Sequence, residues 1–518
     1  MKWYYLAGIA FITRIINILL TRTSFAPDEY YQSIEVAHQL VFGYGYETWE
    51  WRVGLRGYAH PLFFVPPLYL IKYFHLETFS INLIPYACMG MQSIAAMLMD
   101  ISIYYLTLGI FKQRRIATFA FFSSILSYFV FYCAVRTFVN SLEACLTTFA
   151  LTFFVYHYDQ AFIALSALTC VIRPTSAVMF LPLFINRFFS LPFFWDAFCF
   201  LYASLQWFFI SLPCSILMDS VLYGRLTFVI YEFLLFNVFQ NRASLYGVNA
   251  WHWYFSQGLP VLLGTHLIPI LIALCYAFLY RPKPFPFSFF FIALLTLIVY
   301  SFQAHKEFRF IYPLMPFFLP LCGFGLHLLS LHLPLFTLFM WCGIFLNIIA
   351  AVFFNVYHQA GGVAALSSIR SDIFSSSSSF SSSSTIHVHT WMPCHHTPGF
   401  AHLNFGVLSP SLLPVVSIRG LDCSPPPLNA SSYYTSEESS FYLDPLAFVK
   451  HTYIHPSSAS LPLPDYLVLY ADLVDSVLPV LHSFNYELLS SHFHTFFPKA
   501  LDDRMSSLVV VLKRSHID

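Results

Sequence analysis

The sequence predicts a multi-span α-helical membrane protein with a small C-terminal α/β domain. Two features of its composition lead to this prediction. Of its 518 residues only 10% are charged, whereas an ordinary soluble domain has about 25%. Hydrophobic residues make up 58%, and 60 residues are Phe. A soluble chain of this length cannot bury so much apolar surface, and a disordered chain has the opposite composition. The formal net charge is +0, so the overall charge indicates no nucleic acid partner.

A helix that crosses a bilayer needs about 20 apolar residues. By this measure the sequence has about eleven candidate spans. The first, at 5–20, carries Arg14 and lacks a small-residue cleavage site, so we expect a retained span rather than a signal peptide. The other candidates are 85–110, 116–134, 141–157, 160–178, 179–193, 194–216, 259–280, 286–303, 310–328 and 334–355. Prolines interrupt the three runs between 160 and 216, and proline kinks or breaks a helix.

Basic residues in two short loops predict which side of the membrane each loop faces. They are Lys112, Arg114, Arg115, Arg281 and Lys283. Because positive charge accumulates on the cytosolic side, we place both loops there. The long first loop at 22–84, the loops at 217–258 and 304–309, and everything after residue 356 then face the opposite side. The apolar run at 61–74 is too short to span, and we expect it to lie along the interface.

The domain organisation follows from a change in composition near residue 358. We predict a transmembrane region at 1–358, a serine-rich linker at 359–390 and a C-terminal domain at 391–518. The serine run at 375–384 cannot bury a core, which is typical of a linker. Short strand-like runs at 412–418, 466–473 and 508–512 are separated by turn residues, so we expect a small mixed α/β domain.

Cysteines and one sequon add two candidate modifications to the C-terminal domain. Nine of the 11 Cys lie in the hydrophobic part, where free Cys usually acts as a small hydrophobe. Cys394 and Cys423 lie in the C-terminal domain and form a natural disulfide pair if that domain faces an oxidising lumen. The alternative is two free thiols. Asn429 begins the sequence Asn-Ala-Ser and is a candidate glycosylation site on the same side.

Three carboxylates follow the first span. Pro27 suits the first turn of a helix, and Asp28 and Glu29 then lie near its positive N-terminal end. Glu35 comes seven residues after Asp28, so the two share a helical face. Adjacent carboxylates at a membrane surface can supply a general base. The alternative is a solvated helix start whose charges match the helix dipole.

Aromatic residues continue the first loop. Trp49 and Trp51 flank Glu50, an arrangement that suits a sugar-binding surface because ring faces contact sugar C–H groups and a carboxylate binds hydroxyls. The alternative is an interfacial aromatic belt, which needs no ligand. Arg136 and Trp251 lie in polar clusters expected on the same side of the membrane.

The densest charge group of the hydrophobic part lies between two spans. It contains His305, Lys306, Glu307 and Arg309. Cations at this depth suit a phosphate headgroup, and Arg binds phosphate through two parallel hydrogen bonds. The alternative is flanking positive charge with Glu307 as a local partner. We favour the phosphate, because positive charge is depleted on the non-cytosolic side.

Taken together, carboxylates after the first span and cations in a later loop suit transfer from a lipid-phosphate donor. A base deprotonates the acceptor hydroxyl, and the cations stabilise the departing phosphate. Since phosphate is already a good leaving group, this chemistry needs no metal and no cofactor. The sequence contains no Asp-x-Asp pair, no Cys-x-x-Cys and no P-loop, which fits that expectation.

These clusters, in their order along the chain, resemble the family 22 glycosyltransferases. The matching segments are 25–38, 42–45, 48–51, 136–144, 173–175, 219–224, 246–254, 305–310, 357–359 and 392–398. Gly57 and Tyr31 depart from the family pattern, as does the serine run, but no carboxylate or cation is lost. The resemblance implies a GT-C fold of about eleven membrane helices, a location in the endoplasmic reticulum membrane, and dolichyl-phosphate mannose as the donor. It also implies that the active site and the C-terminal domain face the lumen.

The resemblance further implies a reaction. Mannose passes, with inversion and without a metal, to the 2-hydroxyl of the second mannose of the glycosylphosphatidylinositol (GPI) precursor, forming an α-1,2 bond. Asp28 is then the expected base, and Glu29 binds the acceptor or shares that role. The expected donor-phosphate residues are His305, Lys306 and Arg309. The expected acceptor-binding residues are Glu35, Trp49, Glu50, Trp51, Arg136 and Trp251. His395 is expected to fix structure beside Cys394.

Other functions remain open at this stage. The nearest alternative is a sister enzyme that adds the fourth GPI mannose or a mannose of the lipid-linked oligosaccharide. A membrane transporter is the alternative of another class, although it would show charges near mid-membrane in two related halves. A scaffold subunit without chemistry is the third. The sequence predicts lipid-linked substrates and names no protein partner.

Overall fold

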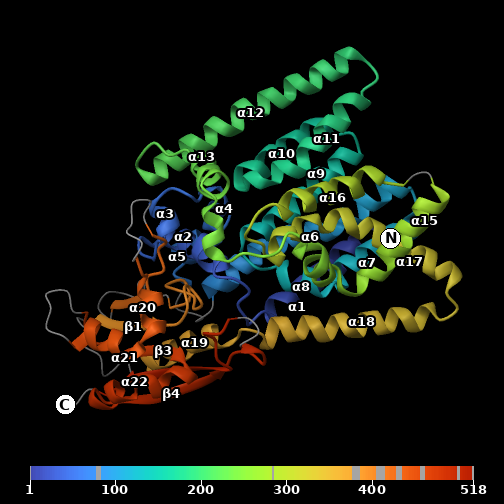
Figure 1. Cartoon of the computed structure of the whole chain (residues 1–518). Coiled ribbons are helices and arrows are strands. Elements are labelled where there is room, and N and C mark those ends of the chain that lie inside the picture. Colours follow the sequence, from blue (N-terminus) through green and yellow to red (C-terminus); the bar gives the residue numbers. More distant parts are fainter. Residues whose placement is uncertain are drawn as a thin grey trace. The chain divides into compact units, whose positions relative to one another are not determined.

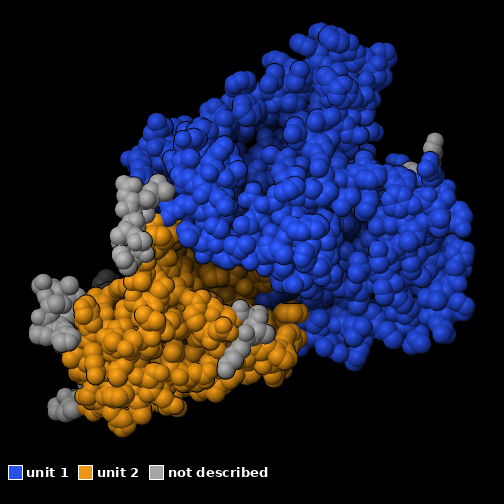
Figure 2. Space-filling view, in the orientation of Figure 1, with its two compact units in different colours: residues 1–19, 50–63, 89–352 blue, residues 20–49, 64–88, 353–518 orange. Residues whose placement is uncertain are grey.

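The computed structural model describes residues 2–76, 83–282, 285–375, 385–403, 415–426, 434–454, 461–498 and 502–515. The candidate glycosylation site Asn429, the basic-loop residue Lys283 and the serines at 376–384 lie outside these residues. The chain forms two compact units, coloured separately in Figure 2. Unit 1 comprises Met1–Leu19, Glu50–Phe63 and Met89–Val352, and unit 2 comprises Leu20–Trp49, Phe64–Cys88 and Phe353–Asp518. Unit 2 therefore groups most of the first long loop with the C-terminal domain. The domain boundaries at 358 and 390 stay a prediction.

Unit 1 is helical (Figure 1). Its main helices are α1 (Trp3–Leu20), α6 (Leu83–Phe111), α7 (Arg114–Leu126), α8 (Tyr128–Cys133), α9 (Val139–Val155), α10 (Asp159–Ile172), α11 (Ala177–Ser190), α12 (Phe194–Tyr223), α13 (Val229–Leu234), α14 (Leu259–Leu263), α15 (Leu267–Tyr280), α16 (Phe287–Ser301), α17 (Met315–His332) and α18 (Phe336–Val352). The short helices α3 (Trp49–Arg52) and α4 (Ala59–Leu62) belong to its part of the first loop.

Six helical segments among the described residues are long and apolar enough to cross a membrane. They are Trp3–Leu20, Leu83–Phe111, Phe194–Tyr223, Tyr254–Tyr280, Phe308–His332 and Phe336–Tyr357. Shorter apolar helices lie at Val139–Val155, Asp159–Ile172, Val229–Phe239 and Phe287–Ser301. The predicted multi-span helical architecture is confirmed, whereas the count of eleven spans stays a prediction.

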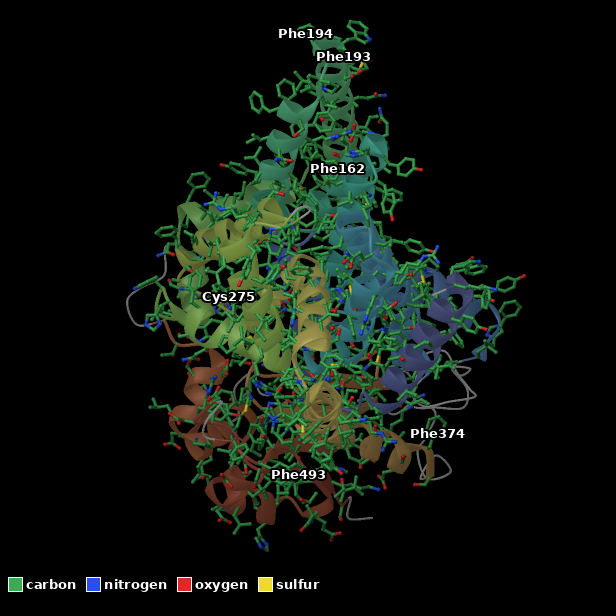
Figure 3. The ribbon with its side chains drawn as sticks, turned by 90° about the vertical axis from the view of Figure 1, so that its right-hand side faces the viewer. Phe162, Phe193, Phe194, Cys275, Phe374 and Phe493 are labelled. Carbon is green, nitrogen blue, oxygen red and sulfur yellow. A yellow bond between two sulfur atoms is a disulfide. The ribbon has the colours of Figure 1, made fainter. Side chains whose placement is uncertain are left out.

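Large apolar side chains cover the outside of several helices. Phe193 and Phe194, at the start of α12, point outward in Figure 3 and are 69% and 86% exposed. Phe162 on α10 is instead fully buried. Exposed apolar patches of this extent mark a surface that contacts something other than water. For long apolar helices, this environment is the lipid of the membrane.

A charged pair is buried among the membrane helices of unit 1. Arg14 of α1 donates from Nε and Nη2 to the two carboxylate oxygens of Asp100 on α6, at 2.8 and 2.7 Å. Ser124 of α7 donates to the same carboxylate at 2.8 Å. Arg14 is 1% exposed and Asp100 is 0% exposed. Because an unpaired charge at this depth is costly, the pair ties three helices together.

Close helix contacts in unit 1 depend on glycine. A Cβ added to Gly325 on α17 would lie 1.8 Å from the carbonyl oxygen of Pro269 on α15. A Cβ on Gly323 would lie 2.7 Å from the carbonyl oxygen of Ile116 on α7. Small residues at such positions let helix backbones approach closely in membranes. The sequence therefore fixes α17 against both neighbours.

Unit 2 contains a five-stranded sheet in the order β2-β1-β3-β5-β4. The strands are β1 (Thr385–Trp391), β2 (Val415–Gly420), β3 (Tyr466–Tyr470), β4 (Tyr486–Phe493) and β5 (Leu508–Arg514). β2, β1 and β3 are parallel, whereas β5 runs antiparallel to β3 and β4. The helices are α19 (Gly361–Ser375), α20 (Glu437–Leu443), α21 (Pro445–Val449) and α22 (Ala471–Ser483). From the first loop, unit 2 also contains α2 (Glu35–Phe42) and α5 (Val65–Tyr73). The predicted small α/β domain is confirmed.

The segment predicted as a serine-rich linker contains ordered structure on both sides of the serines. Residues 361–375 form helix α19, and residues 385–391 form strand β1. Ala365, Leu366, Ile369 and Ile373 recur at helical spacing, and they pack into the core of the sheet domain. This apolar face explains why α19 forms beside a serine run that cannot bury a core.

Candidate active site

Asp28 and Glu29 lie in unit 2, directly before a short π-helix at Tyr30–Ile34. Glu29 is 3% exposed, and its Oε1 accepts the backbone N–H of Phe25 at 2.8 Å. Asp28 is half-buried. The two neighbouring carboxylates therefore differ: Glu29 closes a backbone turn, and Asp28 is the more accessible of the two.

Glu35 is fully buried on α2. Its carboxylate accepts the backbone N–H groups of Phe400 and Ala401 at 3.0 and 2.9 Å. A Cβ on Gly399 would lie 2.8 Å from the carboxylate, so a larger residue there would force the carboxylate to shift. Burial raises the pKa of Glu35 to about 7, although the backbone hydrogen bonds oppose the shift. The carboxylate therefore anchors residues 400 and 401 inside unit 2, and its contact with the acceptor stays a prediction.

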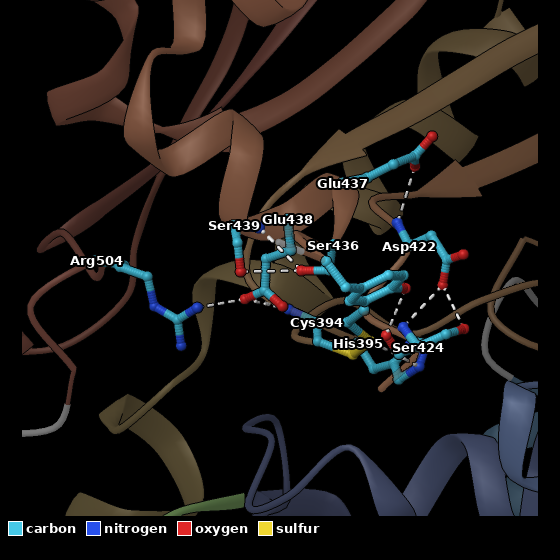
Figure 4. Close-up of a disulfide and its surroundings, with 11 residues drawn as sticks. Cys394, His395, Asp422, Ser424, Ser436, Glu437, Glu438, Ser439 and Arg504 are labelled. Carbon is cyan, nitrogen blue, oxygen red and sulfur yellow. Dashed lines mark hydrogen bonds and ion pairs between the residues drawn. A yellow bond between two sulfur atoms is a disulfide. The ribbon is translucent and has the colours of Figure 1, made fainter. Parts of the chain in front are cut away.

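Cys394 and Cys423 are joined in a disulfide, with their Cα atoms 5.8 Å apart (Figure 4). The bond connects the segment after β1 to the segment after β2. Arg504 pairs with Glu438, and Glu438 accepts the backbone N–H of Cys394 at 3.3 Å. The pair is the one expected from the sequence, and the loop that carries it is held at several points.

His395 follows the first of these cysteines. Its ring lies 4.5 Å from that of Tyr31, and its Nε2 lies 3.7 Å from Cys423 Sγ. The Tyr31 hydroxyl donates to the carbonyl of Thr397 at 2.9 Å. Burial lowers the pKa of His395 to about 4, although the Asp28 carboxylate acts in the opposite direction. The imidazole is therefore neutral at physiological pH.

A small hollow of about 20 Å³ borders this histidine. Tyr31, Tyr46, Thr390, His395 and Thr397 contribute to its lining. The lining thus combines aromatic rings with hydroxyl groups, and the hollow has room for about one water molecule. Cys394, His395 and Cys423 place three possible ligand atoms within 4.8 Å of one another. Because both sulfurs belong to the disulfide, we assign no metal to them.

The predicted acceptor residues of unit 1 lie in different environments. Trp51 is 1% exposed and packs 4.9 Å from the Tyr58 ring, so it belongs to the core. Glu50 pairs with Arg56 at 2.7 Å and is half-buried. Trp251 is exposed. In unit 2, Trp49 is half-buried.

Arg136, the remaining predicted acceptor residue, is buried in unit 1. Its Nε donates to the carbonyl of Tyr132 at 2.8 Å, and its guanidinium lies 4.4 Å from the Tyr132 ring. Only 1% of Arg136 is exposed. Trp51 and Arg136 therefore pack inside unit 1, and their contact with the acceptor stays a prediction.

The predicted donor-phosphate residues of unit 1 surround Glu307. Arg309 donates from Nε and Nη2 to the Glu307 carboxylate, both at 2.7 Å, and His305 lies 3.0 Å from it. Burial alone would raise the pKa of Glu307, but Arg309 and His305 lower it further than burial raises it. The carboxylate is therefore ionised and orients both side chains. Lys306 is 4% exposed and donates to the backbone carbonyls of Asn249 and Gln303.

The sequence prediction missed Glu143 and Arg173 as members of this region. Glu143 is fully buried, accepts from Ser176, and lies 3.2 Å from Arg173. The Arg173 guanidinium also lies 4.9 Å from the ring of Phe310, next to Arg309. In the sequence, the segment 173–175 contributed only to the family resemblance. The signal that could have identified Arg173 was its charge, because charged residues make up only 10% of the chain.

Comparison with known proteins identifies the family. The model of the Alg9-like mannosyltransferase family matches residues 4–404, which is most of the chain. The chain belongs to the Alg9-like mannosyltransferase family. This mannosyltransferase is 36% identical over 516 residues to the GPI alpha-1,2-mannosyltransferase 3 of Bos taurus, covering 98% of this chain and 89% of that protein. It is 30% identical over 499 residues to the GPI mannosyltransferase 3 of Drosophila melanogaster, covering 94% and 83%.

A solved structure supports the fold of this mannosyltransferase. The crystal structure of ArnT from Cupriavidus metallidurans bound to undecaprenyl phosphate matches with a TM-score of 0.53 at 13% identity, covering 98% of this chain and 97% of that chain. At this identity the likeness bears on the fold alone, and it confirms the predicted GT-C fold. Membership of a mannosyltransferase family does not fit the transporter alternative.

Proposed function

We propose that this protein is an α-1,2-mannosyltransferase that adds the third mannose to the GPI-anchor precursor. The observation that carries the proposal is the similarity to GPI alpha-1,2-mannosyltransferase 3 along nearly the whole chain, 36% identity over 98% of it. The donor in this proposal is dolichyl-phosphate mannose. The site is luminal, in the membrane of the endoplasmic reticulum.

The proposed reaction is a single displacement at the anomeric carbon of mannose. Asp28 takes the proton of the acceptor 2-hydroxyl as the oxygen attacks. The new bond joins that oxygen to C1, the bond from C1 to the donor phosphate oxygen breaks, and dolichyl phosphate leaves with the electron pair. One base and one displacement invert the anomeric configuration, so no covalent sugar intermediate is required.

The environments of the two adjacent carboxylates support Asp28 as the base. Glu29 is buried and engaged with the backbone N–H of Phe25, whereas Asp28 is half-buried. A general base must come within hydrogen-bond reach of the proton that it removes. Asp28 meets this condition with less rearrangement than Glu29.

For the donor, we propose that His305, Lys306 and Arg309 bind the phosphate, with Glu307 as the residue that orients Arg309. Lys306 and Arg309 carry two positive charges against the one negative charge of Glu307, so a net positive charge remains for the phosphate. Arg173 is paired with Glu143 and lies near Phe310.

Transfer requires no metal in this proposal, and unchanged activity in the presence of EDTA is the expected result.

Analysis of the GPI intermediates in cells that lack the protein tests the function. We expect a precursor with two mannoses to accumulate, and expression of this chain to restore the third. Accumulation of a precursor with three mannoses would instead assign the fourth-mannose reaction, and an intact GPI pathway with a truncated lipid-linked oligosaccharide would assign the protein to N-glycosylation.

A further inference from the structure

We propose that Phe496 and Phe497, which follow strand β4, insert into the lipid bilayer and attach the C-terminal sheet domain to the membrane surface. The partner that this surface fits is the lipid of the bilayer. The inference goes beyond the proposed function, because it concerns how the domain is attached and does not depend on the reaction. All contacts that carry it lie within unit 2.

The two phenylalanines are exposed although they are large and apolar. Phe496 is 58% exposed and Phe497 is 64% exposed. The ring of Phe493 lies 4.6 Å from that of Phe496. On its other contact, the Phe496 ring stacks on Phe353 at 6.1 Å, with 24° between the ring planes. Exposed apolar clusters of this kind mark a surface that binds a protein or a membrane.

The stacking partner Phe353 belongs to a candidate membrane span. This span is the apolar helical segment Phe336–Tyr357, so Phe353 lies four residues before its end. At 1.5 Å per residue, Phe353 is about 6 Å inside the span. Because the Phe496 ring stacks on Phe353, it lies close to the depth at which the headgroups meet the acyl chains.

The end of the first membrane helix lies at the same level. Helix α1 ends at Leu20, and the residues that follow bind the end of the last span. The N–H of Arg22 donates to the carbonyl of Asn355 at 2.8 Å. The hydroxyl of Thr23 donates to the carbonyl of Phe354 at 2.7 Å. Two candidate spans therefore end next to each other, which indicates where the helices leave the hydrocarbon of the bilayer.

Hydrogen bonds hold the segment after β4 beside this end. The carbonyl of His494 accepts the backbone N–H of Gln359 at 2.8 Å. The hydroxyl of Thr495 lies 3.4 Å from Nδ1 of His358. Gln359 and His358 directly follow the last span. The phenylalanines that come next in the chain are therefore fixed at the membrane boundary.

The composition of this segment suits the interfacial region of a bilayer. Residues 493–498 include three phenylalanines and no Asp, Glu, Lys or Arg. No charged side chain therefore has to enter the membrane with the rings. Interfacial segments bury their apolar face about 5–10 Å into the boundary between headgroups and acyl chains, a depth that a phenylalanine ring reaches. Tyr357, at the end of the span, is 48% exposed and fits the aromatic belt at such a boundary.

Photo-cross-linking of the full chain in phosphatidylcholine vesicles tests the proposal. Phe497→benzoylphenylalanine places the probe in the segment, and mass spectrometry locates the adducts. We expect a phosphatidylcholine adduct with at least half the yield obtained from the same probe at Phe345, which is 63% exposed on the membrane helix α18. The matched control is Leu488, which is also 63% exposed. It lies on β4 about 17 Å along the strand from Phe493, and we expect at least tenfold less lipid adduct there.

A lipid adduct at 497 as rare as that at 488 overturns the proposal. An adduct to another protein in place of lipid, when the same chain is irradiated in native membranes, also overturns it and assigns the surface to a protein partner.

A second measurement does not depend on the cross-linker. Phe497→Cys and Leu488→Cys are labelled in the same vesicles with a maleimide that does not cross membranes, and the labelled peptides are quantified. Both positions lie in unit 2, so the orientation of the protein in the vesicle affects them alike. We expect labelling at 497 to be at least tenfold slower than at 488. Equal rates at these two equally exposed positions contradict insertion into the bilayer.

Discussion

The buried Arg14–Asp100 pair allows a quantitative test of the membrane core. Two charge-assisted hydrogen bonds of 2.8 and 2.7 Å join the side chains, and both residues are at most 1% exposed. Replacing Asp100 by Leu leaves the guanidinium buried without its carboxylate, which typically costs about 3–5 kcal/mol. Replacing Arg14 by Met has a comparable cost. Since whole domains are stable by only about 5–15 kcal/mol, each single variant should be scarce in membranes and unfold early.

The double variant separates pairing from packing. With both charges removed, no buried charge is left unpaired, and apolar replacement of a buried pair is often neutral. We therefore expect Arg14→Met with Asp100→Leu to regain most of the thermal stability lost in either single variant, measured by thermal unfolding in detergent. A double variant as unstable as the sum of the two singles would refute this reasoning.

A partly exposed pair in the same unit serves as the control. Arg187 and Asp159 form the same two hydrogen bonds at 2.8 and 2.9 Å, but their side chains are 13% and 27% exposed. Exposed ion pairs contribute roughly 0–1 kcal/mol. The corresponding Met and Leu substitutions at this pair should shift the unfolding temperature much less.

Three further predictions concern other sites. Gly325→Ala should reduce the amount of folded protein, because its Cβ meets backbone at 1.8 Å, whereas Gly343→Ala has no atom within 4 Å of the new Cβ and should be tolerated. Burial raises the pKa of Glu35 from 4.5 to about 7, so its contribution to stability is fully present below about pH 4.5 and is lost as the pH rises through about 7. The free energy of unfolding that is lost over this range is about 3 kcal/mol. Glu35→Gln should therefore make the unfolding temperature nearly independent of pH between pH 5 and pH 8. Glu307→Gln should raise KM for the donor about tenfold, which corresponds to about 1.4 kcal/mol, while protein levels stay normal. An unchanged KM would show that Glu307 does not orient the donor-phosphate residues.

The class of the fold could be predicted from the sequence. Scarcity of charge and long apolar runs sufficed for a multi-span helical protein, because lipid requires both. The strands at 466–470 and 508–514 were visible as short apolar runs. Helix α19 was missed because the neighbouring serines dominated the composition. The grouping of the first loop with the C-terminal domain depends on contacts between residues far apart in the sequence, which local patterns do not show.

For the candidate site, the sequence located the clusters but not the role of each member. The sequence alone does not distinguish the roles of Asp28 and Glu29. The burial of Glu29 and its hydrogen bond from the Phe25 N–H distinguish the two residues. Trp51, which is predicted at a sugar surface, is 1% exposed. Glu35, which is predicted at the acceptor, accepts backbone N–H groups more than 360 residues away. Tertiary pairing of this kind decides the function of a polar residue, and sequence spacing does not reveal it.

The central claim is that Asp28 is the base of a mannosyl transfer. The most direct measurement is transfer of mannose from dolichyl-phosphate mannose to the two-mannose GPI precursor in membranes containing Asp28→Asn, with the protein amount matched to wild type. A lost general base typically costs 10²–10⁴-fold in rate, so we expect transfer to fall by roughly 100-fold or more. Glu29→Gln, at matched protein amount, should retain far more activity. Near-wild-type transfer by Asp28→Asn would contradict the account.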